Sequence, residues 1–200
     1  MKVGIIGTGN VGSALAAGLS AAGHDVVVGS RDPATNQVNG TDVVSQQAAA
    51  EQGDAVVLAL PASVIVGVAG DLRDALTDKL VIDAANEYPA PSSDSPLATR
   101  VANAAPGAHV VKTFNTIGAN RMASPVIDGE SATMFLAGDD PDAVKTAKTL
   151  ARDLGFDPLV AGGLTAAGHL EHLARFWIHL SQQHGRDIGF RLLREGESNA

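Results

Sequence analysis

Short apolar runs alternate along the chain with stretches whose apolar residues have helical spacing. These runs are residues 3–6, 26–28, 55–60, 80–82, 109–111, 133–137 and 158–160. They contain few polar positions, which is typical of strands that helices cover on both faces of a sheet. The alternation predicts an α/β fold in which a doubly wound, mainly parallel sheet is buried on both sides.

Several helix boundaries can be located between these runs. Apolar residues recur at helical spacing after Gly12, and Gly23 is placed to end that helix. Ser95 and Asp140 each precede a proline, so each predicts a helix N-cap with proline at the first helical position. Between residues 41 and 51 a helix or a short extra strand fits equally, which leaves the strand order open.

The sequence after residue 163 predicts one long amphipathic helix. Its apolar stripe is formed by Ala166, Leu170, Leu173, Trp177 and Leu180, with His, Glu and Arg between them. The stripe packs either on the chain's own sheet or across a dimer.

Composition removes several classes of function. The chain has 200 residues, 14 Lys and Arg against 22 Asp and Glu, and a formal net charge of -8, so its field repels nucleic acids and anionic membranes. It has no cysteine, which excludes disulfides and thiolate chemistry. Redox chemistry would therefore need a bound cofactor. The N-terminus lacks a signal-peptide pattern and no apolar run is long enough to span a membrane, so we expect a cytoplasmic protein.

A glycine-rich segment between the first predicted strand and the first predicted helix indicates a nucleotide site. It comprises Gly7, Thr8, Gly9, Asn10, Val11 and Gly12, which fits GxGxxG. Gly7 would allow a tight turn, Gly9 a close approach of the backbone to a pyrophosphate, and Gly12 close packing of helix on strand. The helix N-terminus would attract the anion, with Thr8 and Asn10 as further donors. Together with the alternating pattern, this motif predicts a Rossmann-type fold.

The end of the second predicted strand distinguishes NADP from NAD. NAD-selective proteins usually place a carboxylate there, whereas this chain has Gly29, Ser30 and Arg31. Arginine forms paired hydrogen bonds with a phosphate, so the segment favours NADP. The alternative is that Asp32 binds the ribose and Arg31 pairs with it or stays solvated.

Residues that follow the other predicted strands should complete the cleft, because ligands bind beyond the carboxyl ends of parallel strands. An apolar bed for the nicotinamide and polar partners for its carboxamide or for a second ligand are supplied by Leu60, Pro61, Ile117, Asn86, Asn115 and Thr116. Lys112 lies within a strand, where a structural and a catalytic role are equally expected. We assign no catalytic residue.

Two other kinds of site are disfavoured. His169, Glu171 and His172 form a cluster in which the two histidines, at i and i+3, share a helical face, but no third ligand at metal-binding spacing is evident, so a solvated polar face is expected and no metal. A Ser-His-Asp hydrolase is poorly supported because the chain lacks a GxSxG elbow.

The sequence resembles the NADPH-dependent deazaflavin (coenzyme F420) reductase family, which is related to the cytosolic domain of six-transmembrane ferric reductases. The resemblance extends from residue 1 to about residue 181. It is carried by the glycine segment, by Ser30 and Arg31, and by residues 58–61 (LALP), 111–117 (VKTFNTI), 135–140 (FLAGDD) and 161–164 (AGGL).

The resemblance implies hydride transfer between NADPH and an 8-hydroxy-5-deazaflavin coenzyme as co-substrate. It assigns Thr8, Ser30 and Arg31 to the phosphates of NADP. It places Pro61, Ile117 and Ala119 around two stacked rings, and Gly163 and Leu164 at the border of the deazaflavin. The chain departs from the family at Gly163, where proline is usual.

The resemblance also bears on domain organisation and partners. It divides one compact unit into a dinucleotide-binding part, 1–162, and a helical segment, 163–200, that completes the acceptor pocket. A homodimer is expected, since the family often dimerises and an exposed Trp177 and Leu180 would need cover. The partner would be a small-molecule electron acceptor. The alternatives are an NADPH-dependent reductase of a flavin, a ferric complex or a small imine or carbonyl, and a non-catalytic NADP-binding sensor.

Overall fold

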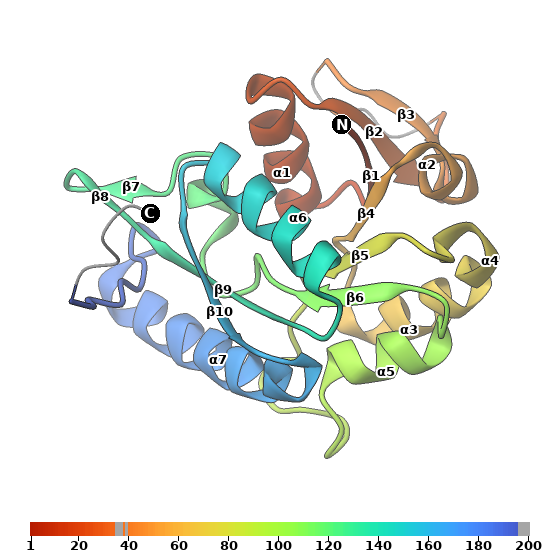
Figure 1. The fold of residues 1–200 in the computed structure, drawn as a ribbon. Helices are drawn as coiled ribbons and strands as arrows, with labels where there is room; N and C mark the ends of the chain where they lie inside the picture. The colour runs from red at the N-terminus through yellow and green to blue at the C-terminus, as the bar shows by residue number, and fades with distance from the viewer. Residues whose placement is uncertain (35–37, 39, 196–200) are drawn as a thin grey trace.

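The computed structural model describes residues 1–34, 38 and 40–195, and within them the strands gather into one large sheet (Figure 1). Its strands are β1 (Lys2–Ile6), β2 (Asp25–Ser30), β3 (Asp42–Ser45), β4 (Ala55–Leu58), β5 (Leu80–Asp83), β6 (His109–Lys112), β9 (Thr133–Gly138) and β10 (Asp157–Gly162). A separate hairpin joins β7 (Val126–Ile127) to β8 (Glu130–Ser131).

The order of the sheet is β10-β9-β6-β5-β4-β1-β2-β3. Neighbours from β3 to β6 are parallel, β9 is antiparallel to β6, and β10 is parallel to β9. The chain builds outward from β1 to β3, then returns to the other side of β1 to build β4 to β6. This reversal confirms the doubly wound, mainly parallel fold and opens a crevice at the carboxyl ends of β1 and β4.

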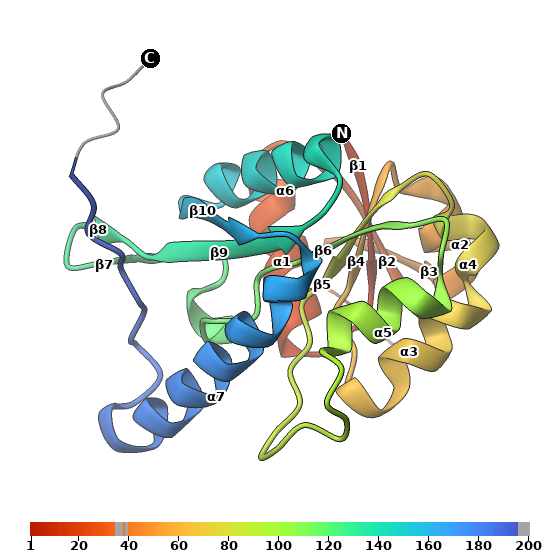
Figure 2. The same ribbon diagram turned by 60° about the horizontal axis from the view of Figure 1, so that its bottom comes forward.

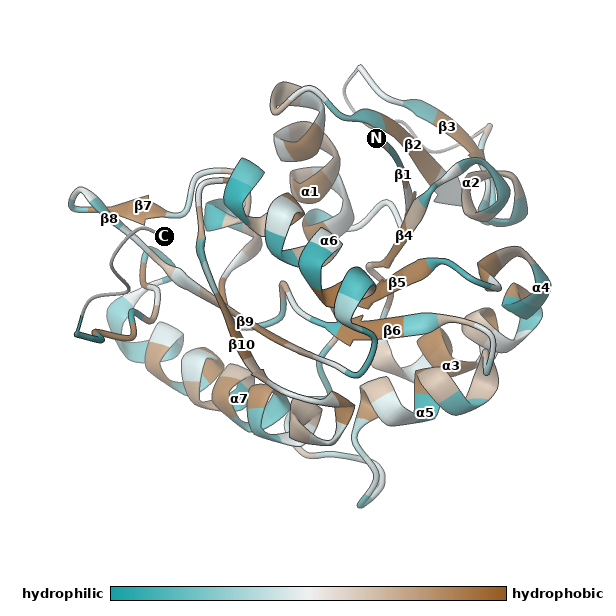
Figure 3. Ribbon diagram, viewed as in Figure 1, coloured by the Kyte–Doolittle hydropathy of each residue, from teal (hydrophilic) through white to brown (hydrophobic). Residues whose placement is uncertain are grey.

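The helices cover both faces of the sheet (Figure 2). One face carries α1 (Asn10–Ala21) and α6 (Pro141–Asp153), and the other carries α2 (Gln46–Gln52), α3 (Ala62–Asp71), α4 (Arg73–Leu76), α5 (Leu97–Ala104) and α7 (Ala167–His184). Val3 and Ile5 enter the first core, and Ile6 enters the second. In Figure 3 much of β5 is brown, whereas much of α6 on the side toward the viewer is teal.

Two of the boundary predictions are confirmed and a third is settled. Asp140 caps α6, where its Oδ1 accepts from the Ala143 N–H at 2.7 Å and proline follows at the first helical position. Gly23, with φ +88°, follows the end of α1. In the ambiguous stretch both elements occur, because β3 leads directly into α2.

The predicted cap at Ser95 is wrong. Pro96 is the N-cap of α5, and the helix begins one residue later, at Leu97. The Leu97 N–H donates to Oε1 of Glu171 at 2.8 Å. A carboxylate from α7 therefore supplies the acceptor that Ser95 was expected to provide, and no local pattern could have located the first residue of the helix.

The C-terminal helix consists of a short 3-10 turn, η2 (Leu164–Ala166), followed by α7. Leu170 and Trp177 are buried, whereas Leu173 and Leu180 are only half-buried. Trp177 is 4% exposed and its Nε1–H donates to the Ile188 carbonyl at 3.0 Å, so it needs no partner molecule to cover it. Residues 196–200 of the predicted C-terminal segment lie outside the described residues.

None of the helices in the described part of the chain is both long and apolar enough to span a bilayer.

Candidate functional site

The glycine segment forms the turn from β1 into α1, and each glycine meets a different steric demand. Gly7 has φ +124°, and a Cβ there would overlap the Ala59 carbonyl. A Cβ on Gly12 would overlap the Gly7 carbonyl, whereas a Cβ on Gly9 would meet nothing within 4 Å. The first turn of α1 has no side-chain cap and no acidic residue. The loop therefore leaves its N–H donors accessible beside Gly9, a geometry that fits a diphosphate.

A cavity of about 300 Å³ extends from this loop to the end of β2. It brings together seven of the predicted residues, Gly7, Thr8, Gly9, Ser30, Arg31, Leu60 and Pro61. Asp32 also lines it, and the Asp32 N–H donates to Oγ of Ser30 at 3.1 Å. Ser30 is buried and Arg31 is exposed, so the hydroxyl shapes the turn while the guanidinium can reach a ligand.

Gly29 limits what can stand at the end of β2. A Cβ there would lie 2.9 Å from Cδ1 of Ile6 and 3.0 Å from both Cβ of Ala49 and Cα of Gln46. A carboxylate side chain at this position would therefore have to displace α2. NAD-selective proteins usually carry a ribose-binding acid at the end of this strand, and the close packing around Gly29 leaves no room for one at that position.

A second cavity, of about 570 Å³, shares Pro61 with the first and extends over Asn86 toward Arg100. Its wall holds Glu87, which is 7% exposed, with Oε1 2.6 Å from an Arg100 nitrogen. Burial acts to raise the pKa of Glu87, but hydrogen bonds from Ser92 and Arg100 and the Arg100 charge hold it below 4.5. Glu87 is therefore a buried, ionised carboxylate, and its Oε2 has no hydrogen-bond partner among the described residues.

The two predicted asparagines bind each other. Asn86 donates to the Asn115 carbonyl at 2.7 Å, and the Asn115 amide donates to Oδ1 of Asn86 at 3.0 Å and to the Leu170 carbonyl at 3.1 Å. Oδ1 of Asn115 is buried, and no hydrogen-bond partner for it lies within the part of the chain that the structure describes. The pair joins the ends of β5 and β6 to α7, so Asn86 lines the cleft with its amide already engaged.

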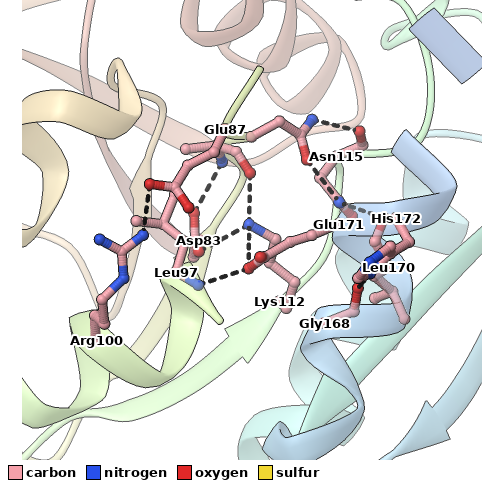
Figure 4. A network of polar contacts seen from close by, with 12 residues as sticks. Asp83, Glu87, Leu97, Arg100, Lys112, Asn115, Gly168, Leu170, Glu171 and His172 are labelled. Atoms are coloured by element: carbon pink, nitrogen blue, oxygen red, sulfur yellow. Dashed lines mark hydrogen bonds and ion pairs between the residues drawn. The ribbon is translucent and has the colours of Figure 1, made fainter. Parts of the chain in front are cut away.

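Lys112 is fully buried, and Figure 4 shows it between Asp83 and Glu171. Its Nζ donates to Oδ2 of Asp83 at 2.9 Å and to the Ala85 carbonyl, and it lies 3.7 Å from Oε1 of Glu171. Lys112 therefore lies beside two buried carboxylates, and these contacts favour the structural role over the catalytic one. The expected solvated face is wrong for Glu171, which is 4% exposed and points at Lys112.

A third cavity, of about 610 Å³, lies beside the first turn of α1. It is lined by Asn10, Ser13, Ala119, Asn120 and Arg186. Ala119 begins η1 (Ala119–Arg121), which packs along α1. Thr116 and Ile117, just before it, are 3% and 8% exposed. This cavity combines two predicted residues with Arg186, which the sequence did not single out.

The predicted acceptor residues Gly163 and Leu164 lie elsewhere. The Leu164 N–H donates to Oδ1 of Asp139 at 2.8 Å, just beyond β9. Because β9 is antiparallel to β6, this position is at the amino-terminal end of β6, and neither residue lines the three cavities described above. Their contact with an acceptor stays a prediction. Within the described residues no group of three or more His, Asp or Glu could hold a metal ion.

Comparisons with known proteins find similarity to NADP-dependent oxidoreductases. Residues 2–87 match the family model described as NADP oxidoreductase coenzyme F420-dependent. The chain is 28% identical to the F420-dependent NADP reductase of Methanothermobacter thermautotrophicus, over 96% of this chain and 94% of that protein. A solved structure of a candidate F420-dependent NADP reductase from Arthrobacter sp. FB24 superposes with a TM-score of 0.88, at 28% identity over 97% of this chain and all of that one.

The relatives in a second group have longer chains. The metalloreductase STEAP3 of Rattus norvegicus is 31% identical over 85% of this chain, but the chain spans only 36% of that protein's length. Both groups are oxidoreductases by name. The matched family implies NADP and the deazaflavin coenzyme F420 as its cofactor and co-substrate.

Proposed function

We propose that this protein transfers a hydride between NADPH and an 8-hydroxy-5-deazaflavin coenzyme, because residues 2–87 match the family model described as NADP oxidoreductase coenzyme F420-dependent. The observation that carries the proposal is the cavity that connects the glycine loop to Ser30 and Arg31. It supplies backbone donors for a diphosphate and a guanidinium for the additional phosphate of NADP.

The roles of the individual residues follow from their positions. The N–H groups beside Gly9 bind the diphosphate, and Ser30 and Arg31 bind the 2′-phosphate. We place the nicotinamide beside Pro61, which lines both the first and the second cavity, and we take Ile117 as a second ring contact from the resemblance alone. NADPH supplies the hydride, one proton with two electrons, and a proton from water completes the reduced acceptor. The chain thus contributes proximity and orientation, and this reaction needs no protein acid or base.

The test is a direct assay under anaerobic conditions. Protein, NADPH and oxidised deazaflavin are mixed, and the absorbance bands of both chromophores are followed. The proposal requires both bands to fall together in equal molar amounts, at a rate proportional to protein concentration. Tight NADPH binding without oxidation by any offered acceptor would instead make the chain a nucleotide-binding sensor.

A second candidate has one observation in its favour, the metalloreductase relative of 31% identity. On that alternative the small-molecule acceptor is a flavin or a ferric complex. The same assay separates the two, because each acceptor is offered alone with NADPH. Faster oxidation by flavin or ferric complex than by deazaflavin would favour the second candidate.

A further inference from the structure

A fourth cavity, of about 590 Å³, lies beside β10, at the outer edge of the sheet. Four strands separate β10 from β1 and its glycine loop, and no residue that lines this cavity lines the other three. Three segments form its wall: α6, the beginning of β10 and the chain that follows α7. The proposed function uses none of these residues.

Positive side chains from two of these segments converge on the cavity. Lys148 and Arg152 lie one turn apart on α6, and Arg191 and Arg194 come from the segment after α7. The cavity thus gathers four of the 14 lysines and arginines of a chain whose formal net charge is -8. Such a local excess of positive charge attracts anions even where the protein as a whole repels them.

The segment that carries the two arginines is held by backbone hydrogen bonds. It runs back from the end of α7 to the start of β9 (Figure 2), where the Thr133 N–H donates to the Phe190 carbonyl at 2.8 Å. The Leu192 N–H donates to Oγ1 of Thr133 at 3.0 Å, and Thr133 is 3% exposed. The position of the segment is therefore set before any ligand binds, which lowers the cost of ordering it.

Two carboxylates balance the arginines of this segment. Nη2 of Arg194 donates to Oδ1 of Asp157 at 3.1 Å, and Arg191 forms an ion pair with Glu130 of β8. The two cations of α6 form no ion pair with any residue that the structure describes. Two positive charges are thus left without a protein partner at this cavity.

Apolar side chains stand beside these charges. Leu159 is half-buried, Val160 is 42% exposed, and Leu193, from the other side of the cavity wall, is 81% exposed. A ligand that covers them would remove apolar surface from water, which favours binding. The cavity therefore fits a molecule that combines an anionic group with an apolar part.

We propose that the fourth cavity binds a phosphate monoester whose organic part is apolar. Such a phosphate carries close to two negative charges at pH 7, which matches the two uncompensated cations. The guanidinium of Arg152 presents paired donors that fit phosphate oxygens, and Lys148 adds a point charge. A soluble phosphorylated metabolite and a lipid with a monoester headgroup share this chemistry. The inference is independent of the proposed function, because no residue of this cavity is assigned to NADP or to the acceptor.

The test uses phenyl phosphate as the soluble probe. Calorimetric titration is carried out with NADP at saturation, so that the nucleotide site is occupied. The double variant Lys148→Gln/Arg152→Gln should raise the Kd of phenyl phosphate at least tenfold, because two charged hydrogen bonds are lost, and should keep the circular dichroism of the wild type. Phenyl sulfate, which has a similar shape but one negative charge, should bind more weakly than phenyl phosphate. No binding of phenyl phosphate, or equal affinity for the two probes, would overturn the inference.

The matched control is Lys145→Gln/Arg73→Gln, which removes two positive charges from exposed positions outside the cavity. Its Kd for phenyl phosphate should equal that of the wild type. A loss as large as that of the cavity variant would show that only the overall charge matters. Arg31→Ala should also leave this Kd unchanged, and a loss there would place the probe in the dinucleotide site. Either result would contradict the proposal.

Sedimentation with phosphatidylcholine vesicles, with and without phosphatidic acid, distinguishes the two sources of the phosphate. Binding that requires phosphatidic acid and is lost in the cavity variant would support the site and assign it to a lipid headgroup. Binding of phenyl phosphate without binding to either kind of vesicle would support the site and assign it to a soluble ligand.

Discussion

Arg31 is the residue that should decide between the two nicotinamide dinucleotides. It is exposed at the end of β2, in the cavity that also contains the glycine loop. Arg31→Ala should cost about 1.5 to 3 kcal/mol of NADPH binding, typical of a charged hydrogen bond, and little of NADH binding. Calorimetric titration with both nucleotides measures this difference. Equal losses for the two would assign the ribose to Asp32 instead.

Two glycines of the loop should respond in opposite ways to the same substitution. Gly9→Ala places a methyl group in open space at an extended backbone position, so the unfolding free energy should stay within about 1 kcal/mol of the wild type. NADP affinity should fall at least tenfold, because the methyl group occupies the approach to the diphosphate.

Gly12→Ala is the matched control for this pair. Its methyl group would overlap the Gly7 carbonyl, so it should lower the unfolding free energy by about 1 to 3 kcal/mol. Urea unfolding and nucleotide titration of both variants check the two expectations. A Gly9→Ala protein that binds NADP normally would remove the diphosphate from this loop.

Glu87 should make stability depend on acid pH. Its pKa in the folded chain lies below 4.5, so the carboxylate stabilises the fold above that value and the contribution is lost as pH falls through the folded pKa. Glu87→Gln should therefore lose stability near neutral pH and show a shallower decline on acidification. Urea unfolding at a series of pH values measures this. Glu51→Gln, an exposed position on α2, is the control, and identical pH profiles for Glu87→Gln and the wild type would contradict the expectation.

At the scale of elements, Glu171 connects three of them. From α7 it accepts the first N–H of α5 and lies beside Lys112 of β6. Glu171→Ala would leave the Leu97 donor buried without a partner, which should cost about 1 to 3 kcal/mol of unfolding free energy. Glu171→Gln keeps the acceptor oxygen and should recover part of it.

The Leu97 amide provides the element-specific measurement. Its hydrogen exchange should accelerate in Glu171→Ala more than in Glu171→Gln, because only the glutamine can still accept its bond. Equal exchange rates in the two variants would show that the carboxylate does not hold the start of α5.

The elements that the sequence predicted are those whose signals are local. The glycine loop, the apolar runs and the Asp140 cap each depend on residues within a few positions of one another. The start of α5 was misplaced because Leu97 and its partner Glu171 are 74 residues apart. Arg186 was missed for the same reason, since it shares a cavity with Asn10, which only the fold brings near it.

At the scale of the whole molecule, the C-terminal helix is integrated with the dinucleotide-binding part. Glu171 reaches the buried Lys112, Leu170 accepts from Asn115, and Trp177 packs near Gly118. These contacts are spread along α7 and involve the carboxyl ends of the central strands. Because Trp177 is already covered within the chain, the need to cover an exposed tryptophan no longer supports the predicted homodimer. The dimer stays a prediction for sedimentation to test.

The same contacts predict one cooperative unfolding transition for the described chain. If residues 1–162 and the C-terminal segment are one unit, NADP bound at the glycine loop must stabilise α7 as much as β1. At a free NADP concentration of about 100 times Kd, the unfolding free energy should rise by about 2.7 kcal/mol, and NAD at equal concentration should raise it less. Thermal unfolding followed by Trp177 fluorescence and by far-ultraviolet circular dichroism should then give coincident curves that shift together. A Trp177 transition that precedes the loss of secondary structure and ignores NADP would make the C-terminal helix a separate unit, and the acceptor side would no longer be coupled to the nucleotide.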